Sequence, residues 1–195
     1  MCRQISRVQT GTVVSISGGQ FKDLVWFLKS DDVDIHDYKY MIINCGVNIA
    51  NKHPTTVAED CRRMECYLKE QLKHDDFPEI LVSLPVPHPS KPRIKDLGEM
   101  VESKLQHTSI RCLNWLKTPN TFLEKDGSIK AALFDRYDRF HLSHAGFRMM
   151  WRKWCTYFPE LLTVENTLEK VRGTVKRRNE YLGHQLILRP ECRKI

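Results

Sequence analysis

The sequence predicts an α/β fold in which a mostly parallel sheet is covered by helices on both faces, a three-layer α/β/α sandwich. Three observations indicate this class. Short apolar runs alternate along the chain with segments whose apolar residues recur at helical spacing. Three of these runs end directly at glycine or proline. The 195 residues, 41% of them hydrophobic, also suffice for one domain with a substantial core.

The first half of the chain supplies two strands and the helix between them. The β-branched run Thr12–Ser17 predicts a strand that stops at a pair of glycines. The segment Gln20–Lys29 carries its apolar residues at helical spacing, so it predicts an amphipathic helix. The apolar run Tyr40–Cys45 predicts the next strand, which ends at Gly46.

The middle of the chain continues the same alternation. A long helix is expected from Pro54, a favoured first helical residue, to about Lys73. Strands are expected at Glu79–Leu84 and Ser109–Leu113, with a helix over Ile94–Leu105 between them. Because strands that are joined through helices run parallel, this order favours a parallel sheet.

Charge and cysteine content indicate which partners and which cellular compartment suit the protein. The 31 basic and 24 acidic residues give a formal net charge of +7, which suits a nucleic-acid partner as well as ordinary solubility. The seven cysteines include no Cys-x-x-Cys pair, which argues against a disulfide framework and a zinc ribbon. No apolar run approaches the ~18 residues of a membrane span, and no apolar segment follows Met1–Thr10. We therefore expect a cytoplasmic or nuclear protein that is not secreted.

The composition changes after Pro159, and this change predicts two regions. Residues 1–159 form the predicted α/β domain, and residues 160–195 form a basic helical tail. The apolar residues between Leu161 and Val175 recur at the spacing of an amphipathic helix. Such a tail is suited to nucleic acid, an anionic membrane surface or a partner helix, and equally to docking on its own domain.

Three segments lie where an α/β sheet places its functional crevice, beyond the carboxyl ends of the strands. Ser17–Leu24 follows the first predicted strand, and Gly46–Ala50 follows the second. Asp135–Gly146 lies nearer the C-terminus. Together and in this order, the three segments resemble the conserved blocks of the SGNH (GDSL-like) hydrolase family.

The resemblance covers roughly residues 12–156 and is most specific at its end. Gly18, followed by an Asp-Leu pair, resembles the family block that supplies a backbone N–H to the oxyanion hole. Gly46 and Asn48 resemble the block that supplies an asparagine donor, although Ile49 stands where the family has aspartate. Asp138 to Gly146 resembles the block Asp-x-x-His-Leu-Ser that supplies two members of the catalytic triad.

Two further stretches narrow the resemblance to one group within the family. The stretch Val14–Gly19 and the stretch Tyr38–Tyr40 resemble the SGNH domains of animal retroelements. The resemblance implies an ester hydrolase in which His141 accepts a proton and Asp138 orients its imidazole. Gly18 N–H and the Asn48 amide would stabilise the oxyanion. It implies neither a cofactor nor a metal; His141 and His144 are three residues apart but lack a third ligand at suitable spacing.

The family's nucleophile block, Gly-Asp-Ser, does not occur in the sequence. Met1–Arg7 instead resembles the helix that follows this serine, so we expect an N-terminally truncated domain without its first, interior strand. The place of this strand in the sheet would be filled by direct pairing of Thr12–Ser17 with Tyr40–Cys45, by Met1–Thr10 or by a partner chain. The remaining alternative is that it stays unfilled. Other nucleophiles are weaker candidates: Ser15, Ser17, Cys45 and Cys2.

Two main functions follow from these residues. The first is an SGNH-type ester hydrolase, with a small ester or acetylated molecule as substrate. The second is a catalytically inactive binding or assembly module that keeps the pocket. A weaker third is association with nucleic acid through the basic tail. A second copy of the chain is a further candidate partner.

Overall fold

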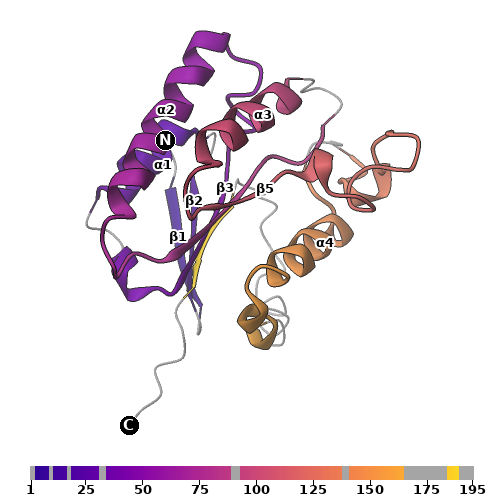
Figure 1. Ribbon diagram of the computed structural model, residues 1–195. Coiled ribbons are helices and arrows are strands. Elements are labelled where there is room, and N and C mark those ends of the chain that lie inside the picture. Colours follow the sequence, from indigo (N-terminus) through magenta and orange to yellow (C-terminus); the bar gives the residue numbers. More distant parts are fainter. Residues whose placement is uncertain are drawn as a thin grey trace. The chain divides into compact units, whose positions relative to one another are not determined.

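The structure is a computed structural model that describes residues 3–8, 11–16, 19–30, 34–88, 93–137, 141–164 and 184–188. The chain divides into two compact units (Figure 1). One unit comprises Met1–Asn120 together with Leu182–Ile195, and the other comprises Thr121–Tyr181. Among the described residues, the first unit contains a sheet and three α-helices, and the second contains one α-helix.

The first unit is built on a six-stranded sheet with the order β1-β2-β6-β3-β4-β5. Its strands are β1 Arg3–Val8, β2 Gly11–Ile16, β3 Tyr40–Asn44, β4 Glu79–Ser83, β5 Arg111–Leu113 and β6 His184–Leu188. Strands β3, β4 and β5 pair in parallel, whereas β1 with β2, β2 with β6, and β6 with β3 pair antiparallel. The predicted α/β class is confirmed, but the sheet is mixed rather than mostly parallel in its pairings.

Three helices connect the strands at the predicted places. They are α1 Phe21–Leu28, α2 Pro54–Gln71 and α3 Ile94–Leu105. All three lie on the same side of β3 and β4 (Figure 1). Helix α1 begins with a capping box, because Gln20 N–H donates to the Asp23 carboxylate at 2.9 Å. Helix α2 begins at Pro54, as its sequence predicts.

The core lies between these helices and one face of the parallel strands. Side chains alternate along each strand, so every second residue of β3 and β4 points toward the helices. This face contributes Met41 and Ile43 of β3 and Ile80 and Val82 of β4 to the core. The opposite face is also buried: Ile42 and Leu81 are fully withdrawn from solvent. On that face the Trp115 indole donates to Ser83 Oγ at 3.2 Å, which satisfies a buried polar pair.

The N-terminal segment is a strand, which corrects the helix expected for Met1–Arg7. Residues Arg3–Val8 form β1, and this strand pairs antiparallel with β2 over its whole length. A helix of seven residues is marginal because few hydrogen bonds offset its nucleation. The β-branched partner Gly11–Ile16 follows after two residues, so an antiparallel hairpin is available instead.

The place between β2 and β3 is taken by β6, a strand from the far end of the chain. It lies in the part predicted as a helical tail, and its five residues correct that prediction for His184–Leu188. None of the named alternatives for closing the sheet anticipated this strand. It pairs antiparallel with both neighbours, with Leu186 opposite Val13 and Ile42. The predicted helix between Leu161 and Val175 lies largely outside the described residues, and Pro159–Val164 forms a 3-10 helix.

The second unit is organised around helix α4, His144–Cys155. The centroids of the Trp151 and Trp154 indole rings lie 6.3 Å apart in an edge-to-face arrangement. The buried residues of this helix are Gly146, Met150, Trp151, Trp154 and Cys155. The helix approaches the preceding chain closely at Gly146. A Cβ atom on Gly146 would stand 2.0 Å from the Leu133 carbonyl oxygen, so this position requires glycine.

Replacing Gly146 by alanine should destabilise the protein, although alanine is the better helix former. Helix propensity alone predicts a gain of about 1 kcal/mol, but the clash with a backbone carbonyl reverses the sign and costs about 1–3 kcal/mol. The reverse exchange at the exposed neighbour, Ala145→Gly, should cost about 1 kcal/mol by propensity. Urea unfolding of both variants measures these changes. A higher unfolding midpoint for Gly146→Ala would show that the close approach is wrong.

Ending the chain at Tyr181 should expose the facing edges of β2 and β3, because both lose their ladder to β6. Hydrogen exchange of amides in Tyr40–Ile42, the part of β3 that pairs with β6, should then accelerate about tenfold or more. Amides of β5 serve as the internal control, since β5 pairs with β4 and not with β6. Unchanged protection of the β3 amides would contradict the position of β6 in the sheet.

Candidate functional site

The turn after β3 is shaped by Gly46, which has a φ of 110°. This conformation disfavours side chains, and a Cβ atom there would also stand 3.0 Å from the Phe21 ring. The Ile49 N–H donates to the Gly46 carbonyl at 3.0 Å and closes the turn. Ile49 itself is fully buried in the core. Ile49 therefore anchors the turn by packing.

Asn48 lies on this turn and reaches the turn that follows β2. Its amide Nδ2 donates to the Gly19 carbonyl at 3.2 Å. The two segments, 29 residues apart in sequence, are thus joined by one side chain. A carboxamide carries two N–H groups, and one remains for a ligand. Two of the three segments singled out by the sequence therefore lie side by side in the first unit.

Charged side chains surround the same junction. The Lys52 ammonium donates to the Gln20 side-chain oxygen at 2.7 Å, which ties the end of the second turn to the start of α1. Asp60 of α2 is only 4% exposed, and its Oδ2 has no hydrogen-bond partner among the described residues. Burial raises the pKa of this carboxyl, while the positive charges of Lys22 and Lys52 oppose the shift.

Sequence reasoning missed Lys52 and Asp60 as neighbours of the candidate site. Lys52 precedes a helix and Asp60 lies inside one, so neither follows a strand end or a family motif. A weak signal was present for Asp60, because it lies in register with Val57 and Met64 on the apolar face of α2. A carboxylate on such a face indicates either a buried partner or an unusual pKa.

His141 lies in the second unit, in a loop that the backbone closes tightly. The Asp135 N–H donates to the His141 carbonyl at 2.7 Å, and Phe134 forms an antiparallel bridge with Leu142. Ser143 caps α4 by accepting a hydrogen bond from Gly146 N–H at 3.2 Å. The Leu-Ser and Gly of the motif thus form the helix start directly after His141.

The predicted site residues therefore divide between the units. Asn48 belongs to the first unit and His141 to the second. Gly18 and Asp138 lie outside the described residues, as do Cys2 and Ser17. The convergence of Gly18, Asn48, Asp138 and His141 stays a prediction.

Cys45 is poorly suited to act as a nucleophile. Its side chain packs against the core cluster, and burial raises its pKa well above the ordinary thiol value, with a contribution from Cys61. Burial likewise raises the pKa values of Cys61 and Cys112 to about 12. Because the thiolate is the reactive form, these cysteines behave as small apolar residues. Within the described ranges no three His, Cys, Asp or Glu side chains gather as a metal site would need.

The raised pKa of Asp60 predicts a pH dependence of stability. A carboxyl that binds its proton more tightly in the folded state favours folding below its ordinary pKa, and this contribution is lost as the pH rises through the folded pKa. The substitution Asp60→Asn removes the titration. Its free energy of unfolding, relative to the unsubstituted protein, should therefore increase from pH 4 to pH 8.

Urea unfolding across this pH range measures the difference. Asp75→Asn, at an exposed position, is the matched control for the loss of one carboxyl group. A flat difference for Asp60→Asn would mean that its carboxyl is not desolvated.

The comparisons with known proteins assign no family to this chain. No family model matches the sequence, and no match is found among the curated proteins. No helix within the described ranges is long and apolar enough to span a membrane. The functional interpretation therefore rests on the residues around the strand-end turns and on the geometry that links them.

Proposed function

We propose that the protein resembles the SGNH ester hydrolases in function. The oxyanion-binding part of its active site is formed by the turns after β2 and β3. The observation that carries the proposal is the hydrogen bond from the Asn48 amide to the Gly19 carbonyl. It places a side-chain donor beside the glycine turn from which the family resemblance takes a backbone donor. Two donors at that spacing suit the carbonyl oxygen of an ester as it becomes negatively charged.

The proposal includes the three-layer sandwich that the resemblance implies. Helices α1, α2 and α3 cover one face of the parallel strands. The opposite face is buried at Ile42, Leu81 and Leu113, which is what a second covering layer requires. In this arrangement the turns after β2 and β3 stand at the carboxyl ends of the strands, where open α/β sheets bind their ligands.

The chemistry assigned to the site is general-base hydrolysis. His141 accepts a proton, Asp138 orients its imidazole, and Gly18 N–H with the Asn48 amide stabilises the tetrahedral oxyanion. The 195 residues contain no Gly-Asp-Ser, so water activated by His141 takes the part of the nucleophile. Loss of a triad serine typically costs about 10⁶ in turnover, while about 10³–10⁴ over water persists from the rest of a site. The proposed activity is therefore slow.

The alternative is a binding or assembly module without turnover. The absence of Gly-Asp-Ser from the sequence favours it, because the remaining donors bind a carbonyl group whether or not a nucleophile attacks. Both functions use Asn48 and the glycine turn. They differ in whether His141 contributes to a reaction.

Hydrolysis of p-nitrophenyl acetate separates the two functions. The hydrolase proposal expects a rate above that of buffer, lost in His141→Ala because the base is removed and in Asn48→Ala because an oxyanion donor is removed. His107→Ala, an exposed histidine in the first unit, is the control for unspecific hydrolysis and should keep the full rate.

A fluorophosphonate probe, which labels activated serines, should leave the protein unmodified. Labelling would instead show that a serine of this chain attacks the substrate. Equal rates for the unsubstituted protein and His141→Ala, without labelling, would favour the non-catalytic module.

A further inference from the structure

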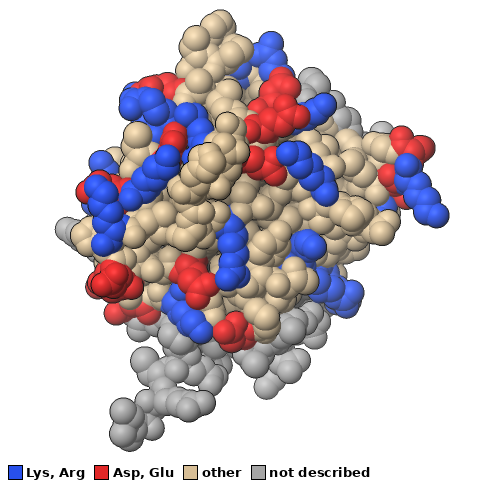
Figure 2. Space-filling model, viewed as in Figure 1, with Lys and Arg blue, Asp and Glu red and all other residues tan. Residues whose placement is uncertain are grey.

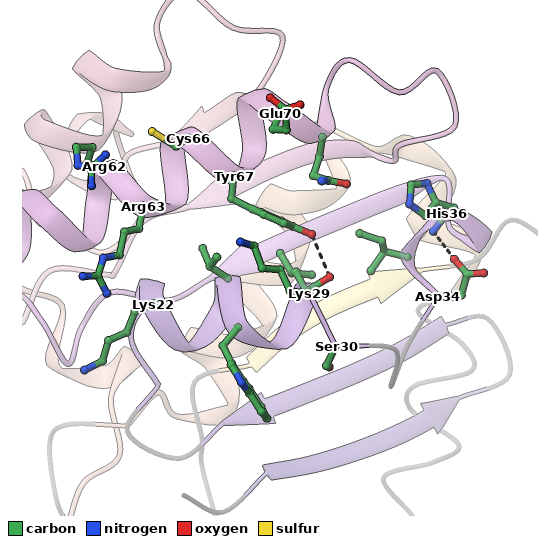
Figure 3. Close-up of a pocket in the computed structure, with 15 residues that line it drawn as sticks. Lys22, Lys29, Ser30, Asp34, His36, Arg62, Arg63, Cys66, Tyr67 and Glu70 are labelled. Atoms are coloured by element: carbon green, nitrogen blue, oxygen red, sulfur yellow. Dashed lines mark hydrogen bonds between the residues drawn. The ribbon is translucent and has the colours of Figure 1, made fainter.

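A groove with a volume of about 1310 Å³ runs between α1 and α2, on residues that the candidate hydrolase site does not use. Tyr67 lines it from α2 and is nearly buried, with its hydroxyl donating to the Leu28 carbonyl at 3.0 Å. This bond ties α2 to the end of α1 and holds the two helices in place. Figure 3 shows Tyr67 and Lys29 between the helices, with Lys22 and Arg63 reaching toward the same end of the groove.

Basic side chains face the groove from both helices. On α1, Lys22, Trp26 and Lys29 recur at i, i+4 and i+7, so they form one stripe along the helix. On α2, Arg62 and Arg63 lie next to the groove. Figure 2 shows Lys and Arg side chains interspersed with Asp and Glu side chains on the side of the molecule where α1 and α2 lie. The groove is thus rich in potential contacts for an anion.

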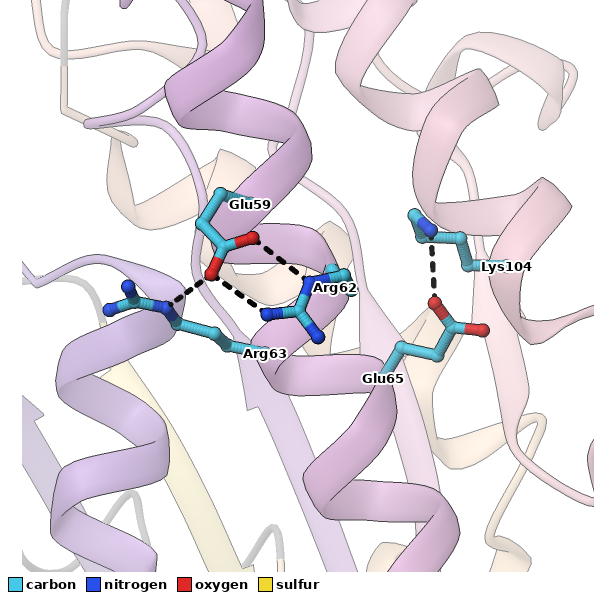
Figure 4. A network of polar contacts seen from close by, with 5 residues as sticks. All are labelled: Glu59, Arg62, Arg63, Glu65 and Lys104. Carbon is cyan, nitrogen blue, oxygen red and sulfur yellow. Dashed lines mark hydrogen bonds and ion pairs between the residues drawn. The ribbon is translucent and has the colours of Figure 1, made fainter.

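The two arginines are only half neutralised. Both donate to Glu59, each at 2.9 Å (Figure 4), and these hydrogen bonds lower the pKa of Glu59 to about 2. The carboxylate is therefore ionised at neutral pH, and it balances one guanidinium of the two. The pair leaves one positive charge, and guanidinium N–H groups that Glu59 does not use are available to a phosphate.

The lysines of α1 add two further charges. Lys22 makes no hydrogen bond or ion pair with any residue that the structure describes, and Lys29 lies 5.9 Å from the centre of the Tyr67 ring. On the acidic side, Glu70 is paired with Lys73 at 2.6 Å. Asp34 accepts the His36 N–H at 3.0 Å and leaves a single negative charge at the opposite end of the groove. At the Lys22 end, the nearby Asp60 carboxyl offsets part of the positive charge, because Lys22 and Arg63 both act on it. The remaining positive charge is shared along the groove by Lys22, Lys29 and the Arg62–Arg63 pair.

Trp26 stands in the middle of this basic stripe and is 64% exposed. An indole exposed to this extent loses the favourable burial that large aromatic side chains usually have. Its neighbours one turn away on the same stripe are the two lysines. A flat aromatic ring flanked by cations is the arrangement with which proteins hold the bases and phosphates of a single strand.

We propose that the groove between α1 and α2 binds a short single strand of nucleic acid, with a base stacked on Trp26 and phosphates held by Lys22, Lys29 and the Arg62–Arg63 pair. An acidic peptide would use the same cations but carries no flat ring to stack on the exposed indole. A nucleotide strand uses both features at once, which is why the observations favour it. The proposal is independent of the proposed hydrolase activity, because the groove contains none of its residues.

Fluorescence anisotropy with fluorescein-labelled dT10 and rU10 tests the stacking contact, and comparing the two shows whether DNA or RNA binds better. Replacing Trp26 by alanine should weaken binding about 5- to 100-fold, because one stacked base is lost. Tyr137→Ala is the matched control, since Tyr137 is an exposed aromatic beside an arginine in the second unit. It should leave the affinity unchanged.

The charge contacts are tested by two double variants that change the net charge equally. Lys22→Glu with Lys29→Glu should weaken binding at least tenfold and flatten the dependence of affinity on salt between 50 and 200 mM. Lys95→Glu with Lys125→Glu, at exposed positions outside the groove, should change the affinity and its salt dependence much less. Circular dichroism melting of each variant shows that the fold is retained.

Four outcomes would overturn the proposal. The first is that neither oligonucleotide binds. The second is that Trp26→Ala binds as tightly as the unsubstituted protein, so that no base stacks on this ring. The third is that both double variants lose affinity equally; phosphates would then be held elsewhere, for instance by the basic residues of 160–195. The fourth is that an oligoglutamate peptide binds the groove more tightly than dT10 and rU10, which would identify an acidic peptide as the ligand.

Discussion

Burial of one face of β3 and β4 under α1, α2 and α3 is the constraint on which the other features of the first unit depend. Parallel strands need a crossover at every step, and each crossover helix has to cover apolar side chains of the sheet. The alternating residues Met41, Ile43, Ile80 and Val82 therefore fix which side of each helix points inward. Because the inward side of each helix is fixed by this packing, the positions of the strand ends and of the outer helix faces are fixed as well.

The strand ends show how packing shapes a candidate site. Gly46 takes a backbone conformation that a larger residue would strain, and it leaves room for the Phe21 ring. Ile49 is buried behind it, so the turn is held from both sides and presents Asn48 toward Gly19. The donor that an oxyanion would require is thus positioned by apolar contacts rather than by other polar groups. Asp60 is the exception, because it keeps a carboxylate within the same packed layer.

The outer faces of α1 and α2 differ in composition from their inner faces. The apolar residues of both helices pack into the core, so charged side chains lie on the solvent side. On α2 the sharing of Glu59 between Arg62 and Arg63 keeps two guanidinium groups ordered without neutralising both. On α1 the exposed indole of Trp26 has no place in the core, because its position in the helix lies on the solvent side. The groove between them is a consequence of the helix spacing that Tyr67 maintains.

Local patterns in the sequence were enough to predict α1, α2, α3 and the strands β2 to β5, since hydrophobic spacing and breaker residues act within a few positions. The strands β1 and β6 were not, because a short segment becomes a strand only when a partner edge is available, and the partner of β6 lies more than a hundred residues away at β3. The contact between Asn48 and Gly19, the burial of Asp60 and the groove beside Trp26 likewise arise from packing between distant segments, which no local pattern encodes.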